Sequence, residues 1–191
     1  MRKFLFVISS FIVVSALAGC GGSKSLQSTD EGNVPDWFTN PPSDPNYFFS
    51  PSTATSQDLQ LAIDKATTGA RAEIGRQVDV KVKALQKRFD EEVGIGEDAE
   101  LMQQFTSATK TVVSTSLSGS RVSKQKQSRD GSIWRAYVLV EYPIGAANQA
   151  LLNQIKKSQN MYTRFRASEA FKELEEETTK YDEWKKGQMQ Q

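Results

Sequence analysis

The spacing of hydrophobic residues changes several times along the chain, and each change predicts a secondary-structure element. An aromatic run beginning at Tyr47 predicts a first strand that continues to about Ala54. Ser56 is then expected to cap a helix, because hydrophobic residues recur behind it at intervals of three and four. The residues of this apolar helix face are Leu59, Ala62, Ile63, Ala66, Ala70 and Ile74. Its three alanines would let the helix lie close to a sheet.

The period changes to two at Val78. Apolar and charged residues alternate in the order Val78, Asp79, Val80, Lys81, Val82, Lys83 and Ala84. This alternation is typical of a half-exposed strand. A loop with Gly94 and Gly96 follows, and a second helix is expected from about Asp98. One side of that helix carries Leu101, Met102, Phe105, Ala108 and Val112. The Ser/Thr-rich stretch 111–120 is ambiguous.

The last part of the chain predicts a hairpin and a helical tail. Residues 117–128 and 132–142 are strand-like and flank an Arg-Asp-Gly turn at 129–131, which is a good hairpin signal. A helical tail opens at Gly145, with a break expected near Asn160. Together the elements predict an α+β fold, with a small antiparallel sheet covered by helices and a long C-terminal helical tail.

The first nineteen residues have the three parts of an export signal. A basic start precedes the apolar run 4–14, which is shorter than the roughly 20 residues that a membrane-crossing helix needs. The sequence Leu17-Ala18-Gly19-Cys20 then matches the bacterial lipobox. We expect cleavage before Cys20 and lipid attachment to its thiol, which would anchor the mature protein without a transmembrane helix. The alternative, a signal-anchor helix with a bystander cysteine, is disfavoured because polar sequence begins immediately at Gly21.

Composition divides the rest of the chain into three expected parts. Residues 20–34 have little to bury and predict a lipidated flexible tether, followed by an α+β domain over 35–145 and a helical extension over 146–191.

The mature chain is expected to be nearly neutral, because loss of two basic residues with the signal lowers the 24 basic residues to 22 against 23 acidic ones. This near-neutral balance implies neither nucleic acid nor another strongly charged polymer as a partner.

Two aromatic residues lie at the start of the expected domain. Trp37 and Phe38 stand within segment 35–42, whose three prolines favour an extended segment and exclude a helix. The pair can pin this N-terminal arm to its own domain, which is the commoner arrangement. Alternatively, the pair can form a hook for a binding partner, because aromatic residues dominate the energetics of interfaces.

Candidate catalytic chemistry is sparse. The chain has no histidine, and its single cysteine, Cys20, is expected to be lipidated, so no catalytic triad or zinc site of cysteine and histidine is predicted. We expect no enzyme activity, no cofactor and no metal. The motif 94–96 lacks the other glycines of a nucleotide-binding loop and predicts a flexible loop.

An acidic cluster near the C-terminus is expected to form a solvated helix surface, with salt bridges to lysines of the same helix. Its members are Glu173, Glu175, Glu176, Glu177, Asp182 and Glu183, and the lysines are Lys172, Lys180, Lys185 and Lys186.

The expected hairpin is basic. Its cationic residues are Arg121, Lys124, Lys126, Arg129 and Arg135. Such residues can bind anionic wall polymer or lipid headgroups, but lysines also protect the edge of a sheet against pairing with another chain. The second interpretation is preferred.

The segment 35–42, the aromatic strand after it, and the helix segments 62–66 and 70–74 together resemble the LPP-twenty family of bacterial lipoproteins. The resemblance covers most of residues 34–142, although Phe48-Phe49-Ser50-Pro51 replaces the usual glycine after the strand. It implies a non-catalytic outer-membrane lipoprotein, with relatives in flagellar outer-membrane assemblies and beside curli-type secretion lipoproteins. The family offers no catalytic residues to transfer, so Cys20 alone is carried over as a site.

The expected function is therefore a structural or assembly role in the cell envelope. Glycine in place of aspartate at position 21 favours the outer membrane, provided that the bacterium has two membranes. Expected partners are the membrane, through the lipid, and envelope proteins or further copies of this chain. The alternative is a module that binds peptidoglycan or another envelope polymer through the basic hairpin.

Overall fold

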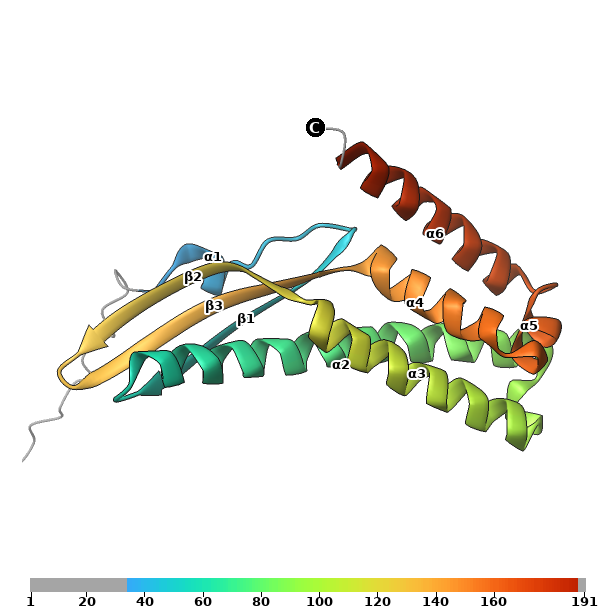
Figure 1. Ribbon diagram of the computed structural model, residues 1–191, viewed down its shortest axis with the longest axis horizontal. Helices are drawn as coiled ribbons and strands as arrows, with labels where there is room; N and C mark the ends of the chain where they lie inside the picture. Colours follow the sequence, from blue (N-terminus) through green and yellow to red (C-terminus); the bar gives the residue numbers. More distant parts are fainter. Residues whose placement is uncertain (1–33, 189–191) are drawn as a thin grey trace, which may run out of the picture. The chain divides into compact units, whose positions relative to one another are not determined.

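The computed structural model describes residues 34–188, which form one compact unit built around a three-stranded antiparallel sheet. Its strands are β1 (Tyr47–Ser56), β2 (Arg121–Asp130) and β3 (Ile133–Pro143), in the order β1-β3-β2. One long helix covers one face of the sheet, and most of the other helices lie beyond its end (Figure 1). The α+β fold with a small antiparallel sheet and C-terminal helices is thus confirmed.

The long helix α2 (Leu59–Val93) covers one face of the sheet. Ala62, Ala66 and Ala70 are fully buried, so the predicted alanine face does pack closely. The predicted cap at Ser56 is wrong by two residues: the Asp58 carboxylate accepts a hydrogen bond of 2.7 Å from the backbone N–H of Leu61. Asp58 therefore satisfies one of the free N–H groups at the helix start.

The strand predicted at 78–84 is wrong, because α2 continues through it. Val78 and Val82 are four residues apart, and this spacing fits one face of a helix as well as one face of a strand. Both residues are buried, as are Ile74 and Phe89 on the same helix face. Val80, which a strand would place beside them, is 67% exposed.

Strands β2 and β3 form the predicted hairpin. Asp130 pairs with Ile133, so the turn contains two residues, and its first residue, Gly131, has a positive φ of 56°. Glycine adopts this conformation without steric cost, which explains its place in the turn. The predicted start at residue 117 is early, because helix α3 (Ala99–Gly119) includes the ambiguous Ser/Thr-rich stretch.

The C-terminal helices share the core of the rest of the unit. These helices are α4 (Ile144–Lys157), α5 (Gln159–Phe165) and α6 (Glu169–Gln188). Phe165 of α5 stacks on Phe89 of α2, with ring centroids 4.3 Å apart, and meets Phe105 of α3 edge-on at 6.0 Å. All three rings are fully buried. The break in the tail falls at Ser158, two residues before the predicted position.

Two short elements differ from expectation. The segment at Trp37 and Phe38 is one turn of helix, α1 (Asp36–Thr39), so the prediction that excluded a helix is wrong. Pro35 precedes this turn, and proline is tolerated where the backbone N–H has no helical partner. The glycine motif at 94–96 overlaps η2 (Ile95–Glu97), a single 3-10 turn in which Ile95 is buried.

The predicted signal, Cys20 and almost all of the tether lie outside the described residues. Among residues 34–188, no helix combines the length and hydrophobicity required to cross a membrane.

Candidate functional site

The sheet face opposite α2 gathers several of the residues singled out in the sequence. Side chains alternate between the two faces of a strand, and Ala136 and Val138 belong to the core on the α2 side. Tyr137 therefore faces away from α2, where Phe38 of α1 meets its ring edge-on at 5.2 Å. Lys126 pairs with Tyr137 across the sheet and so lies on this same face. We call this side of the sheet, opposite α2, the α1 face.

The predicted cationic residues of the hairpin divide between the two faces. Lys124 pairs with Leu139 and shares the α1 face with Lys126. No carboxylate lies within 4.0 Å of either ammonium group among the residues that the structure describes. Arg129 pairs with Trp134 on the other face, where its guanidinium lies 5.1 Å from the centroid of the indole ring.

Arg121 is already bound within the sheet. Its Nε donates a hydrogen bond of 2.7 Å to Oε1 of Glu141, its cross-strand neighbour. The hairpin therefore does not present one continuous row of free cations. Arg135, two residues before Tyr137 on β3, shares the α1 face with Lys124 and Lys126, and none of the three cations has a carboxylate within 4.0 Å in the described part of the chain. In the aromatic arm beside them, Phe38 packs on its own domain and Trp37 is half-buried.

Strand β2 lies at the edge of the sheet, and most of its residues are exposed. Its register shifts between Val122 and Lys124, which marks a β-bulge. Charged side chains and bulges both hinder the pairing of an edge strand with another chain. The position of β2 thus agrees with the preferred interpretation of its lysines.

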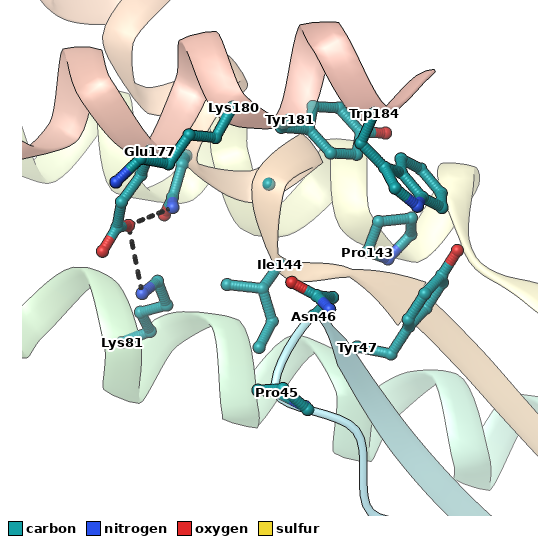
Figure 2. A pocket seen from close by; sticks show the side chains of 12 residues that line it. Pro45, Asn46, Tyr47, Lys81, Pro143, Ile144, Glu177, Lys180, Tyr181 and Trp184 are labelled. Carbon is teal, nitrogen blue, oxygen red and sulfur yellow. Dashed lines mark hydrogen bonds and ion pairs between the residues drawn. The ribbon is translucent and has the colours of Figure 1, made fainter. Parts of the chain in front are cut away.

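A pocket that the sequence analysis missed lies where α6 passes over the start of β1 and the middle of α2 (Figure 2). Its volume is about 310 Å³. Asn46 and Tyr47 contribute from the β1 end, Lys81 from α2, and Glu177 and Trp184 from α6. These residues are far apart in sequence, and only the fold brings them together.

One side of the pocket is an aromatic wall. The Tyr181 ring stacks on Trp184 with centroids 5.7 Å apart, and Tyr47 meets Trp184 edge-on at 6.1 Å. Trp184 is 43% exposed although it belongs to this cluster. Gly145 makes the wall possible, because a Cβ at this position would collide with the Tyr181 ring.

The other side of the pocket is polar and charged. Asn148 Nδ2 donates a hydrogen bond of 2.5 Å to Glu177 Oε2, and the same oxygen lies 3.7 Å from Lys81 Nζ (Figure 2). Lys180 lines the pocket as well, with no carboxylate within 4.0 Å of its ammonium group in the described part of the chain. The pocket therefore joins an aromatic wall to a polar end with a spare positive charge.

Tyrosine side chains ordinarily ionise at about pH 10, and burial moves the two hydroxyls of the wall further from ionisation. Burial raises the pKa of Tyr181, and the nearby Tyr47 and Asp182 raise it further. Burial also raises the pKa of Tyr47; Arg121 opposes this shift, while Glu141 and Asp44 add to it. Both hydroxyls are therefore neutral at physiological pH and can donate and accept hydrogen bonds.

The acidic cluster of α6 makes different ion pairs from those predicted. Its carboxylates reach other helices more than the lysines of α6: Glu173 binds Arg88 of α2, and Glu175 binds Lys156 of α4, both at 2.7 Å. In residues 34–188 no group of three or more acidic, cysteine or histidine side chains is placed to hold a metal ion.

Comparison of the chain with family models, with curated proteins and with solved structures finds no match to any of them.

Proposed function

We propose that the chain is a lipid-anchored lipoprotein of the bacterial outer membrane, with a structural or assembly role in the cell envelope and no catalytic activity. The observation that carries the proposal is the sequence Leu17-Ala18-Gly19-Cys20, which places the sole cysteine directly after a signal-like apolar run. The resemblance to the LPP-twenty family supports it. A flagellar or secretion-associated complex, with envelope proteins or further copies as partners, fits the same role.

The small number of residues between the expected anchor and the folded unit supports this role. The compact unit begins at Val34, fourteen residues after Cys20. A chain of this length reaches at most about 50 Å when fully extended, at 3.3–3.6 Å per residue. A lipid on Cys20 would therefore hold the domain close to the membrane, where even weak contacts with neighbouring envelope proteins gain from the high local concentration.

Metabolic labelling of Cys20→Ser with a clickable palmitate tests the anchor. The parent chain should be labelled, processed and recovered with outer membranes, whereas the variant should accumulate as an unlabelled precursor. A matched control, Cys20→Ser with Ser23→Cys, restores one thiol outside the lipobox and should also stay unlabelled. Label on either variant contradicts the proposal.

The alternative function, binding of peptidoglycan or another anionic envelope polymer, is favoured by Lys124 and Lys126 on the α1 face. If these lysines bind polymer, neutralising both should abolish sedimentation with purified wall, and added salt should weaken it, because exposed charges are screened over about 8 Å at 0.15 M. Arg129→Gln is the matched control, since Arg129 lies on the other face. If the lysines protect the sheet edge instead, the double variant should self-associate and wall binding should not change.

A further inference from the structure

We propose that the pocket between α6, α2 and the start of β1 binds one acidic sugar ring, which packs on the aromatic wall and pairs its carboxylate with Lys180. This site goes beyond the proposed function and uses different residues from the α1 face. Only the source of the sugar, a wall glycan of the envelope, rests on that function.

The size of the pocket suits a single ring. A volume of about 310 Å³ is at the lower end of the range for small-molecule sites, which begins at roughly 300 Å³. Sugar rings have an apolar face of C–H groups, and this face packs well on large aromatic side chains. Trp184 retains 43% exposure beside the pocket, so part of the indole is free for such a contact.

The polar groups suit a ligand rich in hydroxyls. Asn46 contributes a carboxamide that both donates and accepts hydrogen bonds, and Figure 2 shows its side chain beside Ile144 at the pocket. Glu177 can accept further hydrogen bonds, although Asn148 and Lys81 already hold it in place. A purely apolar ligand would desolvate these groups without replacing their hydrogen bonds with water, which is unfavourable.

The charge balance favours an acidic ligand. Lys81 is matched by Glu177 at 3.7 Å, whereas Lys180 has no carboxylate partner within 4.0 Å among residues 34–188. A carboxylate on the sugar would complete this pair, and hydrogen bonds between charged groups are stronger than neutral ones. N-acetylmuramic acid has a ring of this kind, and its lactyl carboxylate is free where the wall glycan has lost its stem peptide. N-acetylglucosamine is the same ring without the lactyl group.

The test titrates the full-length mature lipoprotein, in detergent, with N-acetylmuramic acid and N-acetylglucosamine, and follows tryptophan fluorescence and heat of binding. We expect saturable binding of the acidic sugar with a dissociation constant on the order of 1 mM, as is typical of one small ring. The neutral sugar should bind about tenfold more weakly. Trp184→Phe should remove most of the fluorescence change, and the matched Trp37→Phe should keep it.

Lys180→Gln should weaken binding of the acidic sugar about tenfold and leave the neutral sugar unaffected, while Lys185→Gln on the same helix should change neither. Equal affinity for the two sugars, an unaltered Lys180→Gln titration, or no saturable heat with the parent chain would each overturn the proposal. These outcomes are distinct from failure of the lipid anchor, because binding to the purified chain does not depend on palmitate labelling or membrane location.

Discussion

Replacement of Phe165 by alanine should destabilise the whole folded unit and not only its C-terminal helices. The ring is fully buried and lies against Phe89 of α2 and Phe105 of α3. Truncation of a buried phenylalanine removes apolar contacts and leaves a cavity, at a loss of about 3–5 kcal/mol. Such a loss is a large fraction of the roughly 5–15 kcal/mol that stabilises a typical domain.

The measurement is thermal and urea unfolding, followed by circular dichroism, of residues 20–191 expressed without the signal and carrying Cys20→Ser. For a domain of this size each kcal/mol shifts the melting temperature by about 2–4 °C, so Phe165→Ala should lower it by roughly 6–20 °C in a single transition. Thr163→Ala, an exposed position on the same helix, should leave it nearly unchanged. Two separate transitions in Phe165→Ala, or a shift below about 3 °C, would refute a shared core.

Three further predictions follow from the packing. Val78→Thr should lower the free energy of unfolding by more than about 1 kcal/mol, because α2 buries the Val78 side chain. Val80→Thr should lower it by less than about 0.5 kcal/mol, because the Val80 side chain is exposed. Equal losses in urea unfolding would indicate a strand. Gly145→Ala should cost about 1–3 kcal/mol by displacing Tyr181, and an unchanged urea midpoint would contradict the close approach. Burial raises the pKa of Tyr142, and the nearby Tyr181 adds a smaller effect. The side chain therefore ionises first in the unfolded chain, and stability should fall as pH rises above about 10. Tyr142→Phe should make the decline of the melting temperature with pH shallower.

Local sequence patterns were sufficient for most of the sheet. The two-residue turn at Gly131 depends on a backbone preference of glycine, and β3 is rich in aromatic and β-branched residues and ends at Pro143. Both signals act between neighbours in the sequence, so no knowledge of the tertiary structure was needed. The alanine face of α2 was equally clear because it extends over several turns of helix.

The segment 78–84 shows where local patterns fail. A period of two and a period of 3.6 both place residues i and i+4 on one face, and only the residue between them distinguishes the two. Val80 is that residue, and its hydrophobic side chain is exposed in the helix. The error follows from assuming that a valine in an alternating run must be buried, although exposed apolar residues are common.

The pocket could not be predicted because its walls come from segments that sequence patterns treat separately. The charges of α6 indicate a solvated helix, and most of its residues are indeed exposed. Glu177, however, binds Asn148 and lies near Lys81, and Tyr181 packs on the bare backbone at Gly145. These contacts bring one face of α6 down over the start of β1. Tyr181 and Trp184, spaced three residues apart on a charged helix, were the sequence signal that this face has a partner.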